Sequence, residues 1–107
     1  MLSLRFGDPS DVEAQSGELG FWLAPEWWGR GVMTAAVKVF VHDVLPLANA
    51  RRALPVVRVA STVYAPNKAS RRVLEKSGFE FEGRMRSAYR KNGVLVDGDL
   101  LAWVAPS

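Results

Sequence analysis

A glycine turn between a strand pattern and a helix pattern is the feature that most restricts how this chain folds. Apolar and polar residues alternate over 17–23, glycines follow at positions 29 and 31, and an apolar run with helical spacing begins at Val32. Glycines at a helix start let the backbone approach a ligand, and the free N–H groups and the dipole of the helix favour an anion there. This order is therefore typical of a phosphate or pyrophosphate site, although glycines before a helix are also ordinary turn residues.

The rest of the chain alternates between strand and helix patterns. β-Branched residues dominate 56–63, Asn67 is a favourable N-cap, Gly78 suits a helix C-terminus, and Asn92-Gly93 is typical of a hairpin turn. The patterns predict strands at 2–6, 17–23, 56–63, 79–89 and 99–104, and helices at 32–45 and 68–77. Strands that alternate with helices predict an α/β fold, in which helices pack on a mixed sheet, in the order β-β-α-β-α-β-β.

Side-chain spacing indicates how each helix is buried. In the first helix, Thr34, Lys38 and His42 form one polar stripe and apolar residues fill the rest, which predicts a largely buried helix that Pro46 ends or kinks. The inward face of the second helix is expected to hold Ala69, Val73, Leu74 and Ser77. Its charged residues, Arg71 among them, are expected to face solvent.

Composition limits the class of protein. A chain of 107 residues is long enough for one domain, and the lack of cysteine excludes disulfides and a thiol nucleophile. Spaced cysteine and histidine ligands are missing, so we expect no metal site. The apolar runs are too short to span a bilayer and the N-terminus lacks a signal-peptide pattern, so we expect a cytoplasmic protein without membrane contact. The net charge of +3 suits an anionic ligand without requiring one.

Two segments together resemble the GNAT superfamily of acetyl-CoA-dependent N-acetyltransferases. The first is the tryptophan-glycine-arginine-glycine turn at 28–31, and the second is the helix from Asn67 to Gly78-Phe79 with Ser70 three residues after the asparagine. Both occur in the order and at the spacing shown by the ribosomal-protein-alanine N-acetyltransferase-like branch. The resemblance covers roughly Leu2 to Val104, which is nearly the whole chain.

The resemblance implies that residues 1–107 form a single GNAT-like domain that is N-terminally incomplete. A complete domain of the family has further strands and helices before the strand that Leu2–Phe6 matches. Those elements normally build much of the groove for the acceptor substrate. The resemblance therefore implies the C-terminal, cofactor-binding part of an acyl-CoA N-acyltransferase fold, and leaves the activity of the isolated chain open.

The resemblance also assigns residues to acetyl-CoA, the acyl donor. The turn at the start of the first helix matches the pyrophosphate loop, in which backbone amides bind the anion. The preceding strand matches the one whose opened edge pairs with the pantetheine arm, and whose N–H groups polarise the thioester carbonyl. The implied cofactor-binding residues are Phe21, Trp22, Leu23, Trp28, Gly29, Arg30, Gly31, Val32, Met33, Thr34, Asn67 and Ser70. Met33 is bulkier than most residues at its position in the family, and Arg30 is equally compatible with a solvated loop residue.

Two residues are candidates for catalysis. Glu18 lies on the strand where many members of the family carry a general base, and Ser70 matches a serine that donates to the leaving thiolate in this branch. A solvent-facing carboxylate and a local hydrogen-bond partner in a first helical turn are the alternatives. Tyr89 stands where the bacterial ribosomal-protein acetyltransferases have glutamate, which argues against transferring their mechanism and substrate. His42 is interpreted as structural or solvated.

The predicted function is transfer of acetyl from acetyl-CoA to a primary amine, which is either a protein N-terminus or a small amine. The alternative is a non-catalytic remnant that binds CoA or associates through its sheet. A basic RNA-binding module is a weaker third possibility, because Arg84, Arg86, Arg90 and Lys91 alternate along a strand without an RNA-binding aromatic signature. A sheet edge and an apolar face without their usual neighbours predict a homo-oligomer.

Overall fold

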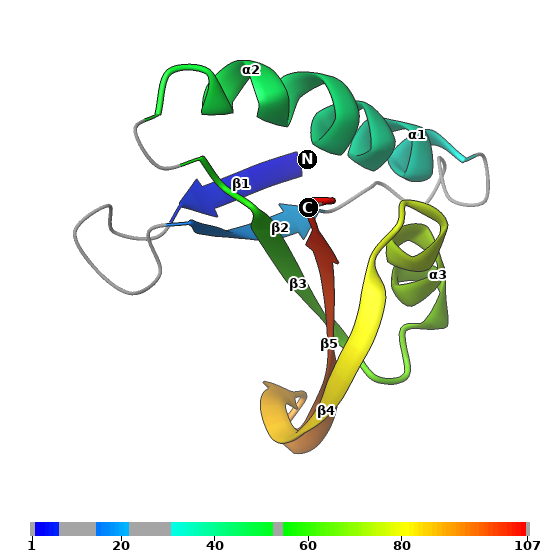
Figure 1. Ribbon diagram of the computed structural model, residues 1–107. Coiled ribbons are helices and arrows are strands. Elements are labelled where there is room, and N and C mark those ends of the chain that lie inside the picture. Colours follow the sequence, from blue (N-terminus) through cyan, green and yellow to red (C-terminus); the bar gives the residue numbers. More distant parts are fainter. Residues whose placement is uncertain (1, 7–14, 22–30, 53–54, 107) are drawn as a thin grey trace.

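The protein folds as a mixed sheet with helices packed against it (Figure 1). The computed structural model describes residues 2–6, 15–21, 31–52 and 55–106. The strands in these ranges are β1 (Leu2–Phe6), β2 (Ser16–Phe21), β3 (Arg58–Tyr64), β4 (Glu80–Lys91) and β5 (Val94–Val104). They form one sheet in the order β1-β2-β3-β5-β4, in which β2 and β3 are parallel and the other pairs antiparallel. The predicted α/β class with a mixed sheet is confirmed.

The predicted first helix is divided into three segments. They are α1 (Val32–Val39), the π-helical η2 (Phe40–Val44) and α2 (Leu45–Asn49), which contains Pro46 in its first turn. Proline lacks an N–H group, and in an α-helix its ring collides with the carbonyl group four residues earlier. A π-turn before the proline relieves this conflict, so the helical run continues to Asn49 instead of ending near residue 45.

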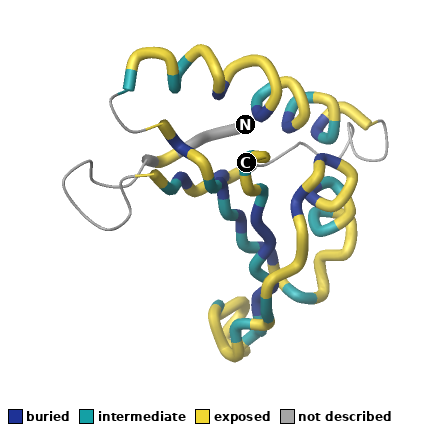
Figure 2. The backbone as a smooth tube through the Cα atoms, viewed as in Figure 1, coloured by how far each residue is buried: buried dark blue, intermediate teal, exposed yellow. Residues whose placement is uncertain are grey.

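The helical run is less buried than its composition predicted. Its inward stripe consists of Met33, Val37, Val41 and Leu45, spaced four residues apart. Figure 2 shows much of the run in the colour of exposed residues. The exposed apolar side chains include Val39 at 51% and Leu47 at 72%. The prediction of a largely buried helix is wrong, because only one stripe of the apolar surface contacts the sheet.

The same run also corrects the prediction that no apolar segment reaches membrane-spanning length. Val32–Asn49 is a helix of 18 residues with a mean hydropathy of 1.2, which is long and apolar enough to cross a membrane by length and composition. The sequence pattern was interrupted at Pro46, but the structure joins both sides of the proline into one run. Its inward stripe packs against the sheet, and 22% of the helix is buried.

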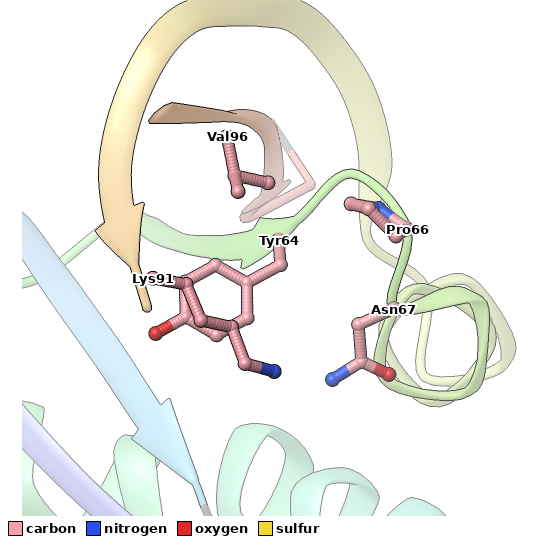
Figure 3. Close-up of a pocket in the computed structure, with 5 residues that line it drawn as sticks. All are labelled: Tyr64, Pro66, Asn67, Lys91 and Val96. Atoms are coloured by element: carbon pink, nitrogen blue, oxygen red, sulfur yellow. The ribbon is translucent and has the colours of Figure 1, made fainter. Parts of the chain in front are cut away.

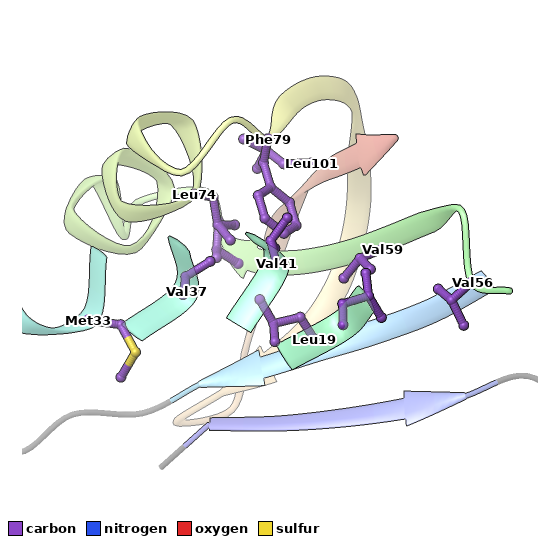
Figure 4. Close-up of a cluster of buried hydrophobic side chains, with 11 residues drawn as sticks. Leu19, Met33, Val37, Val41, Val56, Val59, Leu74, Phe79 and Leu101 are labelled. Carbon is purple, nitrogen blue, oxygen red and sulfur yellow. The ribbon is translucent and has the colours of Figure 1, made fainter. Parts of the chain in front are cut away.

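The core lies between the sheet and the helices (Figure 4). Side chains from β2, β3 and β5 meet those of the helical run and of α3 (Lys68–Lys76). The cluster consists of Leu19, Met33, Val37, Val41, Leu45, Val56, Val59, Val63, Leu74, Phe79 and Leu101. Along β3, residues 59, 61 and 63 are buried on this face, whereas residues 58, 60, 62 and 64 occupy the opposite face and are half-buried or exposed. The helices therefore cover one face of β3.

Local signals place α3 and the hairpin as predicted. The Asn67 side chain accepts a hydrogen bond from the Ser70 N–H at 3.1 Å, and Gly78 has a φ of 94° at the C-terminus. Asn92 and Gly93 both have positive φ, at 52° and 80°, as a two-residue hairpin turn requires. β5 begins at Val94, five residues earlier than predicted, because Asp97, Gly98 and Asp99 are part of the strand despite low strand propensity.

An ion cluster around a buried carboxylate joins α3 to the hairpin. The Asp99 carboxylate, 1% exposed, accepts from Arg84 Nε at 2.6 Å and from Arg71 Nη1 at 3.2 Å. The prediction that Arg71 faces solvent is therefore wrong: its guanidinium packs over the Phe81 ring at 4.5 Å and reaches a buried partner. Two guanidinium groups offset the cost of burying one carboxylate, and so α3 is fixed to the sheet.

Candidate functional site

The central feature of the site is a parting of two parallel strands. β2 and β3 pair over three positions, Ser16 with Arg58, Gly17 with Val59 and Glu18 with Ala60. β2 continues to Phe21 and β3 to Tyr64, but the described residues form no further pairs along this boundary. The two strands therefore part beyond Glu18 and Ala60, and an extended ligand with amide groups can pair with strand edges of this kind.

A side chain supports the structure where the pairing ends. The Ser61 hydroxyl, 1% exposed, donates to the Leu19 carbonyl at 2.8 Å. This bond links β3 to β2 just beyond the last paired position, Glu18 with Ala60. The Ser61 side chain thus bridges the two strands at the point where their backbone pairing ends.

The glycine turn contributes the N-terminus of α1. Gly31 is the N-cap with a φ of 71°, a left-handed conformation that strains side chains other than glycine, and no side chain caps the helix. Its carbonyl accepts the N–H of Ala35 at 3.0 Å, so the helix begins directly after it. The first turn contains no acidic residue, and a Cβ built on Gly31 meets no atom within 4 Å. Among the described residues, the N-terminus of α1 thus has no side-chain cap and no acidic side chain in its first turn.

The side chains after Gly31 leave the backbone accessible. Met33 is 7% exposed and belongs to the core, so its bulk lies away from the surface of the turn. Thr34 is half-buried and Val32 is exposed. The large side chain at position 33 therefore does not oppose close approach to this part of the backbone.

Several predicted cofactor residues lie outside the described residues. They are Trp22, Leu23, Trp28, Gly29 and Arg30. Phe21 is the last residue of β2 and pairs with Leu2 of β1. The structure therefore describes the end of β2 and the N-cap of α1, which come directly before and after residues 22–30 in the sequence.

The N-terminus of α3 presents the two other predicted site residues. Asn67 is exposed and Ser70 is half-buried, and the bond between the Asn67 side chain and the Ser70 N–H holds them together. This bond uses Oδ1 of Asn67, so the amide nitrogen is directed elsewhere. α1 and α3 contact each other, which brings both helices to the same side of the sheet.

The remaining candidates separate into exposed and packed residues. Glu18 is exposed on β2 at the last paired position before the strands part, and His42 is exposed on η2. Tyr89 is half-buried: its hydroxyl donates to Thr62 Oγ1 at 2.5 Å and its ring meets Tyr64 edge to face at 4.7 Å. Tyr89 thus packs across the sheet at the position where the family resemblance predicted a glutamate.

A pocket of about 320 Å³ lies at the end of β3, next to the start of α3 (Figure 3). It is lined by Tyr64, Pro66, Asn67, Lys91 and Val96. Figure 3 shows the Lys91 ammonium and the Asn67 amide nitrogen pointing toward each other across the gap. The sequence analysis placed Lys91 on a basic strand and did not select Tyr64. The hairpin signal at Asn92-Gly93 was the one indication that Lys91 lies next to a strand turn.

Outside the site, one exposed ion pair has shifted pKa values. Arg58 donates to both carboxylate oxygens of Glu82, at 2.8 and 2.6 Å. This hydrogen bonding lowers the pKa of Glu82 and raises the pKa of Arg58. The pair joins the start of β3 to β4 on the face opposite the core.

Comparisons with known proteins find similar sequences and structures. The profile of the acetyltransferase (GNAT) domain matches residues 3–80. The probable N-acetyltransferase YjcK of Bacillus subtilis (strain 168) is 36% identical over 92 residues, which are 86% of this chain and 48% of that protein. The putative ribosomal N-acetyltransferase YdaF of the same strain is 34% identical over 97 residues, which are 91% of this chain and 48% of that protein.

The three-dimensional comparison agrees. The structure of RimL, a ribosomal L7/L12 alpha-N-protein acetyltransferase in complex with coenzyme A, superposes with a TM-score of 0.78 at 25% identity. The match covers 97% of this chain and 54% of that one. This chain spans about half the length of the curated relatives it matches.

Proposed function

Because the chain belongs to the GNAT family of acetyltransferases, we propose that it takes part in transferring an acetyl group from acetyl-CoA to a primary amine. The observation that carries the proposal is the parting of β2 and β3 close in sequence to the uncapped N-terminus of α1. An anion at that N-terminus and an amide-bearing arm along the opened edge are the two parts of one CoA molecule. We propose the whole chain, 1–107, as the domain that holds it.

The cofactor contacts follow from these two elements. The pyrophosphate is proposed to bind the backbone amides of the turn from Trp28 to Thr34, where Gly31 keeps the approach open. The pantetheine arm is proposed to pair with the edge at 21–23, and Asn67 to contact it from α3. A helix N-terminus binds an anion through partial charges on N–H groups, so this mode tolerates the unusual side chain at Met33.

The proposed chemistry uses few side chains. The amine nitrogen attacks the thioester carbonyl, a C–N bond forms and the C–S bond breaks, and the amine proton passes to Glu18 directly or through water. Backbone N–H groups of the opened edge stabilise the charge that develops on the carbonyl oxygen. The Ser70 hydroxyl donates to the departing thiolate. Exposed Glu18 next to the opened edge and half-buried Ser70 at the start of α3 are compatible with these roles.

CoA binding is tested by isothermal titration of the full chain with CoA and with desulfo-CoA. Gly31→Val should weaken both by about tenfold or more, because a branched side chain blocks the anion and strains the left-handed turn. Gly93→Val is a matched control: Gly93 also has a positive φ and open space around its Cβ, but it lies in the distant hairpin turn. Equal CoA affinity in the folded Gly31→Val variant would reject the assignment.

Catalysis is tested separately, by acetyl-CoA consumption with a panel of amines and N-terminal peptides. Ser70→Ala should lower turnover more than cofactor affinity, and Glu18→Gln should lower activity most at neutral pH, where less free amine is present. Losses of about ten- to a thousandfold are expected for groups of this kind. CoA binding without any turnover would instead support a non-catalytic binding role. The cytoplasmic location and the homo-oligomeric state stay predictions.

A further inference from the structure

We propose that the pocket at the end of β3 binds a carboxylate attached to an apolar group, and that acceptors for this chain are amines that carry such a carboxylate. The identification of this ligand as the acceptor rests on the proposed acetyl transfer. The pocket is lined by Tyr64, Pro66, Asn67, Lys91 and Val96. Tyr64, Pro66 and Val96 offer apolar surface, and Asn67 and Lys91 offer nitrogen donors.

The two donors converge without an acceptor between them. The Ser70 N–H fixes Oδ1 of Asn67, so the amide nitrogen with its two hydrogens faces the gap. Lys91 faces it from the other side, and its ammonium lies 5.4 Å from the centroid of the Tyr64 ring. Among the described residues, Lys91 has no carboxylate partner within ion-pair distance. A ligand carboxylate between these groups would accept from both.

The surrounding packing holds the cation in position. β4 has a bulge between Met85 and Tyr89, where Ser87 has a φ of 52° and its N–H donates to the Asp97 carboxylate at 2.8 Å. Beyond the bulge, Tyr89 and Lys91 both contact Tyr64, one by an edge-to-face ring contact and the other through its ammonium. The Tyr64 ring, packed against Tyr89, thus forms one wall of the pocket, and the Lys91 ammonium lies against that wall.

The electrostatics favour an anionic ligand over a polycation. The pocket lining contains one positive side chain and no acidic residue. A polyamine acceptor would place ammonium groups next to Lys91, which is repulsive, whereas an amino acid or an acidic peptide end would be attracted. The pocket lies at the end of the opened β3 edge and beside Asn67, which is where an acceptor must meet the proposed cofactor arm.

The test uses a pair of probes that differ only in charge. 3-Phenylpropionate and its neutral amide are titrated into the full-length chain, with binding followed through the NMR signals of the Val96 methyl groups and the Asn67 side-chain amide. The carboxylate should bind saturably and at least about fivefold more tightly than the amide, and Lys91→Met should remove that preference while Lys91→Arg restores most of it. Lys76→Met, at the exposed end of α3, is the control and should bind like the wild type.

Further arms separate the possible failures. Equal binding of inorganic phosphate would show a general anion site and overturn the proposal, as would equal affinities for the two probes in the wild type. Displacement of the carboxylate by CoA would assign the pocket to the cofactor and also overturn it. If the chain binds the carboxylate but not CoA, the pocket is supported and the proposed function is rejected. If it binds CoA but does not prefer the carboxylate, the proposed function is supported and the pocket is rejected.

Discussion

Replacing Asp99 with asparagine should destabilise the protein by about 2–3 kcal/mol. Asp99 is 1% exposed and accepts charge-assisted hydrogen bonds from Arg84 at 2.6 Å and Arg71 at 3.2 Å, each of a kind that contributes about 1.5–3 kcal/mol. The loss is smaller than the sum, because the amide oxygen of asparagine still accepts one bond. The two arginine side chains are 31% and 49% exposed, so their charges reach water after the carboxylate is removed.

Removing both arginines should cost more than removing the carboxylate. The double variant Arg71→Met/Arg84→Met leaves the Asp99 charge buried without a partner, and losses of this type are about 3–5 kcal/mol. The order of the two effects follows from burial: the cations retain access to water and the anion does not. Asp43→Asn, at an exposed position on η2, is the control and should change stability by about 0.5 kcal/mol or less.

The assay is equilibrium unfolding in urea at neutral pH, monitored by tryptophan fluorescence, with Trp103 packed against the core as a reporter. A loss of 2–3 kcal/mol also corresponds to a fall in melting temperature of about 10–20 °C for a domain of this size. A change below about 0.5 kcal/mol for Asp99→Asn, or a double arginine variant that is more stable than Asp99→Asn, would refute the reasoning.

Three further predictions concern the sheet and its surface. Gly98→Ala places a Cβ 2.6 Å from Tyr89 Cε2, so the Tyr89 ring must shift, and the free energy of unfolding in urea should fall by about 1–3 kcal/mol. Gly83→Ala is the control and should be nearly neutral, because its Cβ meets no atom within 4 Å. An equal loss in both variants would contradict the packing argument. Because the pKa of Glu82 is lowered, its pair with Arg58 stabilises the fold above the usual glutamate pKa and loses that contribution as pH falls through the lowered value. The free energies of unfolding of the wild type and Glu82→Gln should therefore differ by at most about 1 kcal/mol at pH 7 and converge in acid. A difference that grows in acid would contradict this prediction. The exposed Val39 and Leu47 and the edge position of β1 predict a homo-oligomer, which light scattering at micromolar concentration checks, and a stable monomer would count against it.

Sequence patterns predicted the elements that depend on local signals. Asn67 and Gly78 bound α3, and Asn92-Gly93 form the hairpin turn, because capping and positive φ are properties of one or two residues. The turn at Gly31 was predicted for the same reason, and its left-handed conformation is observed. Roles assigned to Glu18 and Ser70 stay predictions, since they depend on a bound substrate.

The features that sequence reasoning missed depend on contacts between distant residues. Arg71 looked solvent-facing on its helix, but its partner Asp99 lies 28 positions away on β5. Tyr64 and Lys91 line the pocket from two different strands, β3 and β4. Their proximity depends on the pairing of both strands with β5 and on the bulge in β4, which local sequence does not specify. The exposure of the helical run was missed because hydrophobic periodicity gives the width of an apolar face and not what covers it.

In the proposed complex, one CoA molecule contacts both the opened edge of β2 and the N-terminus of α1. This arrangement is tested most directly by titrating CoA into the isotope-labelled chain and following backbone amide shifts by NMR. Saturable shifts are expected at Leu19–Phe21 and Gly31–Thr34, with smaller ones at Asn67 and none at Asn92-Gly93. Shifts confined to the basic β4–β5 hairpin, or the lack of saturable shifts in the folded protein, would contradict this arrangement.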